Sequence, residues 1–327
     1  MTEASRDGSG FEPVSASGAA AKEGWARRLV AHTAFPVVLG STLVAAHASF
    51  QAGRADIAAF ALLLATAVVV AVLERLFPHH ASWLHSTGDL RVDMAYVPTV
   101  TVTSQIAGAG AIWLGFQASA WASAALGATL WPAHWPIAAQ LVLALVAAEL
   151  PKYWAHRLEH EVDFLWRIHA THHSVPRLYF LNASRFHPLD IALDGLLGFG
   201  PLVALGAGEE VLLLFSVVSA VHGYFQHANL ATRIGPLNYF FSMAELHRWH
   251  HSKTIAEANH NYGQNSSVWD LVFGTFFWPK DREPPEHIGL ADLPAFPTTF
   301  WRQLASPFAW RRIRAESRAL AERADTA

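Results

Sequence analysis

Four long apolar segments constrain this chain more than any other feature. They run from Leu29 to Phe50, from Ile57 to Leu73, from Met94 to Phe116, and from Trp135 to Ala148 with extensions at either end. Each is near the length of about 20 residues that a helix needs to cross a bilayer. Only 15% of the 327 residues are charged, well below the roughly 25% of soluble domains. The sequence therefore predicts an all-α integral membrane protein with about four transmembrane helices.

A further apolar region is interrupted by a turn. Leu196 to Leu205 and Val211 to Val221 flank the turn Gly-Ala-Gly-Glu-Glu at residues 206–210. Each arm has about half of the roughly 20 residues that a span requires. We therefore expect a shallow re-entrant hairpin within residues 191–221 rather than two crossings.

Basic residues indicate how the helices are oriented, because Lys and Arg stay preferentially on the cytoplasmic side. If the N-terminus is inside, the outer loops are Phe50 to Ile57 and Gln117 to His134. These loops hold one of the 23 Lys and Arg residues, Arg54. Everything after Leu150 is then expected in the cytoplasm.

The chain divides by composition into four regions. Residues 1–24 are rich in Ser, Gly, Ala and Glu and are expected to form a disordered leader rather than a signal peptide. Residues 25–150 hold the membrane helices, 151–280 hold most histidines, and 281–327 form a tail. Apolar residues and arginines alternate at helical spacing from Phe300 to Ala327, which predicts an amphipathic helix on the inner leaflet. A solvated charged tail is the alternative.

Composition also limits the chemistry. The chain has no cysteine, which excludes disulfides, thiolate nucleophiles and iron–sulfur ligation. Any bound metal must therefore have nitrogen or oxygen ligands. The net charge of −3 does not indicate a nucleic acid partner.

Histidines are concentrated and regularly spaced in the third region. Of 19 histidines, 12 lie between His156 and His260. His156 and His160 are one helical turn apart, and His-x-x-His-His occurs twice, at residues 169–173 and 247–251. An isolated pair is more often a surface coincidence than a metal site. Three stacked imidazoles gain little without a metal ion, and this arrangement occurs twice.

Counting the imidazoles predicts a binuclear site, because ten are too many for one ion. Imidazole suits iron, zinc, copper and nickel, so ligand type does not name the metal. The ten candidate ligands are His156, His160, His169, His172, His173, His222, His227, His247, His250 and His251. Because the first pair directly follows the fourth apolar segment, the site is expected at the cytoplasmic membrane surface, open to a substrate from the lipid.

At these residues the sequence resembles the fatty acid hydroxylase and sterol desaturase superfamily of integral membrane non-haem di-iron oxygenases. The resemblance covers roughly residues 148–279. Its motifs are Tyr153-Trp-x-His156-Arg-x-x-His160, His169-x-x-His172-His173-Ser174, Asn182 to Arg185-x-His187-Pro188, His227-x-Asn229, His247-x-x-His250-His251-Ser252, and Asn261-Tyr262-Gly263 to Trp269-Asp270-x-x-Phe273-Gly274-Thr275.

This resemblance implies a helical bundle with a cytosolic histidine cap, two iron ions and O2 as oxidant; zinc is a possible metal as purified. The reaction would hydroxylate or desaturate a lipid, with fatty acyl chains, sterols, carotenoids and ether lipids as candidates. Electrons would come from a separate ferredoxin or cytochrome with its reductase, since no haem, flavin or nicotinamide motif is present.

The resemblance also suggests roles around the ligands. Asp190, Asp270 and Glu159 are candidates to orient ligand imidazoles, although Asp270 could equally cap a helix or turn. His187 is expected to be structural or to support a ligand, and His260 to be a nearby polar group. The glycines at 263 and 274 are expected at tight turns.

Two other function classes compete with the oxygenase. A membrane zinc hydrolase needs fewer histidines and an acid–base carboxylate, and the sequence has no His-Glu-x-x-His. A metal transporter or sensor would place its ligands within the crossing helices. High Ala and Arg content further suggests a bacterial protein of the inner membrane.

Overall fold

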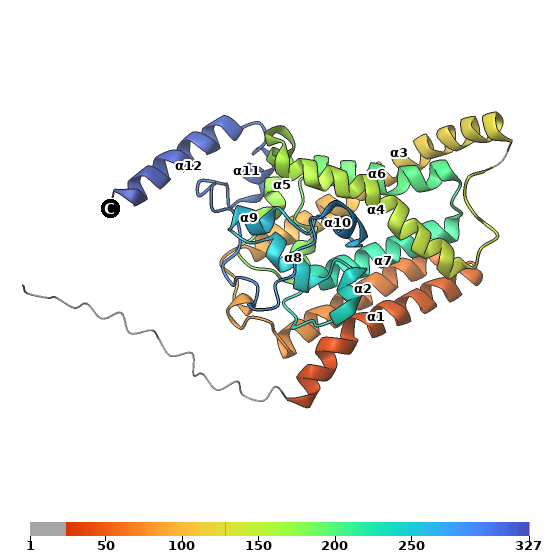
Figure 1. The fold of residues 1–327 in the computed structure, drawn as a ribbon, viewed down its shortest axis with the longest axis horizontal. Helices are drawn as coiled ribbons and strands as arrows, with labels where there is room; N and C mark the ends of the chain where they lie inside the picture. The colour runs from red at the N-terminus through yellow and green to blue at the C-terminus, as the bar shows by residue number, and fades with distance from the viewer. Residues whose placement is uncertain (1–23, 128, 327) are drawn as a thin grey trace, which may run out of the picture.

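The computed structural model describes residues 24–127 and 129–326, whose regular structure is helical (Figure 1). The expected leader, apart from Gly24, lies outside the described residues. The principal helices are α1 (Trp25–Gln51), α2 (Ala55–Leu76), α3 (Leu90–Leu126), α4 (Ile137–Glu161), α5 (Asp163–His173), α6 (Pro188–Leu205), α7 (Glu209–His227), α8 (Ala244–His250), α9 (Ile255–Ala258), α10 (Val268–Phe273), α11 (Phe300–Leu304) and α12 (Trp310–Asp325).

Four helices are long and apolar enough to cross a membrane by length and composition. They are α1, residues 57–76 of α2, α4 and α6. The chain is thus an integral membrane protein, and α2 exposes the apolar side chains of Ile57, Phe60 and Leu64. The set differs from the expected one, because the segment from Met94 to Phe116 lies in α3, which does not belong to it, whereas α6 does.

The expected re-entrant hairpin has longer arms than its apolar runs indicate. Its arms belong to α6 and α7, which have 18 and 19 residues, and both helices continue through polar residues that end the apolar runs in the sequence. One such residue, Asp194, pairs with Lys152 of α4 at 3.1 Å. The bundle therefore supplies the partner that lipid cannot.

The tip of this hairpin reaches the end of the bundle where the two expected outer loops lie (Figure 1). Gly206, in a left-handed conformation with φ +96°, packs so closely on Thr129 that a Cβ atom would lie 3.1 Å from the threonine Cβ. Glu210 contacts His47 and Gln51 at the end of α1. The α6–α7 hairpin therefore extends along the whole bundle.

Helix α7 is the centre of the bundle, packed against α1, α2 and α4. Its residues Leu214, Val218 and Val221 are buried in the main apolar core. Helix α6 packs instead on α3 through small residues: a Cβ atom on Gly115 would lie 2.7 Å from Val203 Cβ. Such close backbone approach is typical of membrane helix pairs.

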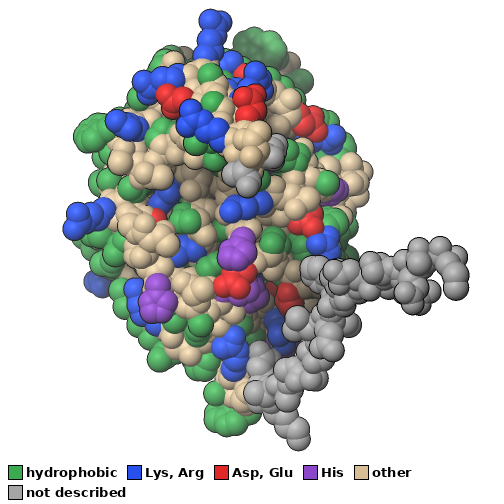
Figure 2. All heavy atoms as spheres, turned by 90° about the vertical axis from the view of Figure 1, so that its left-hand side faces the viewer, with side chains coloured by type: hydrophobic (Ala, Val, Ile, Leu, Met, Phe, Trp, Pro, Cys, Tyr) green, Lys and Arg blue, Asp and Glu red, His purple; other side chains and the backbone are tan. Residues whose placement is uncertain are grey.

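The shorter helices α5 and α8–α12 cover the opposite end of the bundle, where charged side chains gather on the surface (Figure 2). The expected C-terminal helix is present as α12. Its apolar residues Trp310 and Ile313 are buried against Leu293 and Phe296, and Trp310 donates to Asp163 of α5 at 3.1 Å. These apolar side chains therefore stabilise the cap and are not available to the inner leaflet.

Candidate metal centre

Four helices bring the histidines together at the junction of bundle and cap. His156 and His160 lie in the last turns of α4, and His227 is the last residue of α7. The two His-x-x-His-His segments lie at the C-terminal ends of α5 and α8. Because each of these helices is packed against other helices, the imidazoles meet in a preformed arrangement.

Nine of the ten candidate ligands form two groups in which the ligand atoms lie within 4.8 Å of one another. We call the group of five site A and the group of four site B. All are buried except His160, which is partly buried. Site A consists of His156, His160, His169, His173 and His250, and site B consists of His172, His227, His247 and His251.

Each His-x-x-His-His segment is divided between the two sites. On α5 the first and last histidines face site A and His172 faces site B; on the α8 segment the first and last face site B and His250 faces site A. The reason is helical geometry: residues i and i+4 differ by about 40° in direction, whereas i+3 and i+4 differ by about 100°. Each segment thus contributes two histidines to one site and one histidine to the other.

In site A, outward hydrogen bonds fix which ring nitrogen carries the proton. His156 Nδ1 donates to the Tyr262 carbonyl at 2.7 Å, and His169 Nδ1 donates to the Asp190 carboxylate at 2.9 Å. The Nε2 atom of each ring is then an unprotonated lone pair. Yet these two Nε2 atoms lie only 3.1 Å apart, in an arrangement that a cation between them would stabilise.

Site B shows the same pattern around His247. Its Nε2 lies 2.9 Å from Nε2 of both His227 and His251. His227 Nδ1 donates to Asn182 Oδ1 at 3.0 Å, which leaves its Nε2 bare. Nitrogens about 2.1 Å from one ion are separated by about 3.0 Å at right angles, so this spacing fits ligands of a single metal ion.

Unpartnered buried nitrogens give a second test of fit. Among the described residues, Nε2 of His160, His173 and His250 has no hydrogen-bond partner, although leaving a buried polar atom unpaired is costly. Burial, followed by neighbouring imidazoles, holds the pKa of His173 and His250 well below the usual value of 6.5. Neutral imidazoles with unused lone pairs are the form that binds metal. The residues present therefore fit two metal ions.

The structure does not bring His222 to either site. It lies five residues before His227 on α7, about 140° around the helix. Its ring packs edge-on to Phe35 and near Phe241, and neither ring nitrogen has a partner. Its predicted role as a ligand disagrees with this placement.

The carboxylates divide into two kinds. Asp190 holds His169 as expected, and Glu159 lies farther from the same nitrogen, at 3.4 Å. Asp270 contacts no imidazole; it accepts from the backbone N–H of Tyr262 and Gly263, each at 2.8 Å. Asp270 therefore supports the loop whose carbonyl holds His156, which is the turn-capping alternative.

The other two predicted neighbours act through different atoms. His187 caps the start of α6 by accepting from Leu189 N, and its Nε2 donates to the Leu304 carbonyl at 3.1 Å. His260 contributes its backbone carbonyl, which accepts from His250 Nδ1 at 2.9 Å. Both residues are structural supports.

The glycines at 263 and 274 occupy special positions, as expected. Gly274 ends α10 with φ +74°. A Cβ atom on Gly263 would lie 2.2 Å from the Ser266 carbonyl oxygen, so no larger residue fits there.

Sequence reasoning missed several supporting residues. Asn182 and Asn259 place amide oxygens 3.0 and 3.3 Å from Nδ1 of His227 and His160. Phe186 stacks on His172 with ring centroids 4.0 Å apart. Asn182 lies in a quoted motif, but nothing in its spacing indicates which histidine it would contact.

A cavity of about 150 Å³ touches both sites. Site A contributes His156 and His169 to its wall, and site B contributes His172, His227 and His247. The remaining wall is mixed: polar side chains, among them Lys152, Asp190 and Asp194, stand beside the apolar Phe186 and Ile191. This cavity is where a substrate can approach both groups.

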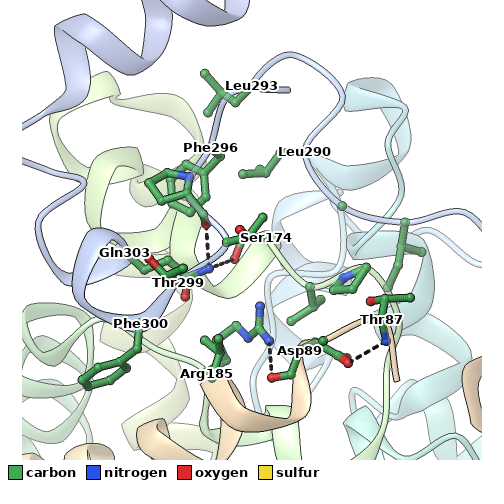
Figure 3. Close-up of a pocket in the computed structure, with 18 of the residues that line it drawn as sticks. Thr87, Asp89, Ser174, Arg185, Leu290, Leu293, Phe296, Thr299, Phe300 and Gln303 are labelled. Carbon is green, nitrogen blue, oxygen red and sulfur yellow. Dashed lines mark hydrogen bonds between the residues drawn. The ribbon is translucent and has the colours of Figure 1, made fainter. Parts of the chain in front are cut away.

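A larger cavity, about 670 Å³, lies elsewhere (Figure 3). No histidine of either site lines it, although Ser174 follows His173 directly. Figure 3 shows Gln303 bonded to Ser174, and Arg185 reaching the backbone of Asp89. Arg185 also pairs with buried Asp93, and its carbonyl accepts from His172 at 3.3 Å. This wall supports site B from outside.

Comparisons with known proteins agree with this geometry. The Fatty acid hydroxylase family model matches residues 141–275. The ornithine lipid hydroxylase OlsE of Rhizobium tropici is 40% identical over 276 residues, 84% of this chain and 82% of that protein. No solved structure matches.

Two animal relatives match less than half of this chain. Human alkylglycerol monooxygenase is 29% identical over 41% of this chain and 29% of its own length. Methylsterol monooxygenase 1 of Rattus norvegicus is 31% identical over 38% of this chain and 41% of its own length. Because one relative aligns along most of both chains and the family model covers the histidine segments, the chain belongs to the fatty acid hydroxylase family of membrane lipid hydroxylases.

Proposed function

We propose that this protein hydroxylates an ornithine-type membrane lipid with two iron ions, one held by site A and one by site B. The observation that carries the proposal is the cavity shared by both groups. Two iron ions there would supply activation of O2 for attack on an unactivated C–H bond. Zinc fits the same nitrogens but has no redox chemistry, which disfavours the hydrolase alternative for a lipid hydroxylase.

The chain's own residues orient the ligands and exclude water. Asp190 fixes His169, the Tyr262 carbonyl fixes His156, and Asn182 fixes His227. Such outer contacts typically change metal affinity 10- to 100-fold. Their burial keeps bulk water from the reacting atoms.

A charged pair in the cavity wall supports attack near the lipid's head group. Lys152 and Asp194 form an ion pair in this wall, beside Gln226. Placing the methylene groups of a lipid chain against this ion pair is unfavourable. An amino acid head group, in contrast, carries charges that can pair with Lys152 and Asp194. The name of the OlsE relative, an ornithine lipid hydroxylase, agrees with this choice.

We further propose that the cap faces the cytoplasm and that α3, α6 and α7 cross the bilayer with α1, α2 and α4. The scarcity of Lys and Arg in the loops at the other end supports this orientation. A bacterial relative supports the inner membrane. Under this arrangement the lipid reaches the cavity from the inner leaflet.

The test is lipid mass spectrometry of cells that make ornithine lipid and express wild type, His172→Ala or His134→Ala. His134 is an exposed histidine remote from both sites and serves as the control. We expect an ornithine lipid heavier by one oxygen with wild type and His134→Ala only. Stoichiometric zinc with unchanged lipids, although iron and a reductase are supplied, would favour the hydrolase.

A further inference from the structure

Hydroxylation needs electrons from outside the site, and this inference rests on the proposed function. The balanced reaction is R–H + O2 + 2 H⁺ + 2 e⁻ → R–OH + H2O. One C–H bond breaks and one C–O bond forms, while the second oxygen atom leaves as water. Histidine ligands supply no electrons, so a one-electron donor must contact the surface twice in each turnover.

A basic cavity of about 470 Å³ opens on the cap, between the start of α1, the α8 helix and residues 278–284. Five Arg or Lys side chains and two Glu side chains line it. We call it the basic cavity. Its charged residues are Arg27, Arg233, Arg248, Lys280, Arg282, Glu245 and Glu283.

Two buried residues that line the basic cavity are neighbours in sequence of histidines from both sites. Arg248 follows His247 of site B, and Trp249 precedes His250 of site A. Both are fully buried, with Arg248 2% and Trp249 1% exposed. The Trp249 ring lies 4.6 Å from the guanidinium carbon of Arg282 at the rim. An aromatic ring and a short run of α8 backbone thus separate a molecule in this cavity from ligands of both ions.

A second cap cavity, about 310 Å³, also reaches the histidines but has the opposite charge balance. It contacts His160 and His173 of site A. Three acidic and two basic side chains line it: Glu161, Asp163, Asp292, Lys253 and Arg314. This second cavity touches ligands of site A, whereas Arg248 and Trp249 in the basic cavity are neighbours in sequence of ligands from both sites.

We propose that the basic cavity is the docking site of an acidic one-electron carrier protein, whose electrons enter through Arg248, Trp249 and the α8 histidines. Charge complementarity of this kind steers association and raises its rate 10- to 1,000-fold at low salt. The excess of basic over acidic residues in the wall fits an acidic partner.

The experiment uses the full-length enzyme in lipid nanodiscs with ornithine lipid, NADPH, a ferredoxin reductase and an acidic [2Fe–2S] ferredoxin as probe. The test variant is Lys280→Glu with Arg282→Gln. The control is Arg311→Glu with Arg318→Gln, which makes the same charge change on the exposed face of α12. We expect the test variant to need about 10-fold more ferredoxin for half-maximal rate at low salt, with kcat unchanged and a smaller difference at high salt.

Chemical reduction separates docking from catalysis. After reduction by dithionite and exposure to O2, all three proteins should form equal product in one turnover. An unchanged ferredoxin requirement in the test variant, or an equal rise in the control, overturns the docking proposal. The proposal is also overturned if the only change in the test variant is that it no longer retains phosphatidylglycerol. That result would make the cavity a site for anionic lipid. Chemically reduced wild type that forms no product contradicts the proposed function itself.

Discussion

Sites A and B lie side by side and share two helical segments, but they are supported differently. In site A, four of the five rings have an oxygen acceptor at Nδ1; these rings are His156, His160, His169 and His250. In site B, Nδ1 of His247 and His251 has no partner within the part of the chain that the structure describes. The surrounding protein therefore orients site A, whereas site B depends more on the metal ion for its geometry.

Access to the two sites also differs. His160 of site A is partly buried and lines a cavity on the cap, whereas all four rings of site B are buried. Site A is also the one with a carboxylate, Asp190, on a ligand. We therefore expect site A to bind its ion more tightly than site B.

The largest expected effect follows from removing the central ligand of site B. His247 Nε2 contacts Nε2 of both His227 and His251. His247→Ala should lower the metal content from about two ions to about one and abolish lipid hydroxylation, because both ions are needed at the shared cavity. Elemental analysis of the purified protein measures the first effect. Retention of two ions would mean that the two sites do not act as separate groups.

A smaller effect is expected from the carboxylate of site A. Asp190→Asn weakens the hydrogen bond to His169 and should lower metal affinity at site A by about 10- to 100-fold, leaving site B unchanged. Glu159→Gln is the matched control, because its oxygen is 3.4 Å from the same nitrogen rather than 2.9 Å. Chelator competition measures both affinities. Equal effects of the two variants would contradict the assigned role of Asp190.

Acidification should separate the sites further. Burial and neighbouring imidazoles lower the pKa of His172 and His251 in the native state, while the unfolded chain keeps values near 6.5. Below about pH 6.5 the unfolded state therefore binds more protons, so stability falls as the pH falls and is constant above it. Between about pH 7 and 5 we expect site B to lose its metal ion first. Metal analysis of desalted samples measures this loss. Simultaneous loss from both sites would remove the predicted difference.

The smallest effect on metal binding is expected at His222, which the structure places outside both sites. His222→Leu should keep two ions and full hydroxylation. It should also stabilise the protein by about 1 kcal/mol, because two unpaired buried nitrogens are replaced by an apolar group. A thermal melt monitored by circular dichroism measures this stability. Loss of one ion would restore the ligand role predicted from sequence.

Residue spacing alone identified most of the metal centre but not its supports. The i, i+4 pair at His156 and the two His-x-x-His-His segments predict a binuclear histidine site, and nine of the ten candidates do gather. Local spacing could not exclude His222 as a ligand. A gap of five residues places it away from His227 only once α7 is known to be a helix that runs through both residues and packs on Phe35.

The membrane topology was also only partly predictable. Apolar runs indicate α1, α2 and α4 because lipid-facing helices must be apolar along their length. They underestimate α6 and α7, because Asp194 and His222 interrupt the hydropathy while bundle partners such as Lys152 and Phe35 surround them. A helix that is surrounded by protein does not have to be apolar along its whole length, as a helix in contact with lipid does.

The sequence by itself determined that this chain is a membrane protein with histidine clusters suited to a metal site, because hydropathy and helical periodicity are local properties. Only the tertiary structure decided which histidine belongs to which site. That choice depends on how α5 and α8 face each other, so that His172 joins the α8 pair and His250 joins the α5 pair. It also decided which oxygen holds each imidazole, because Asp190, Asn182 and the Tyr262 carbonyl come from distant parts of the chain.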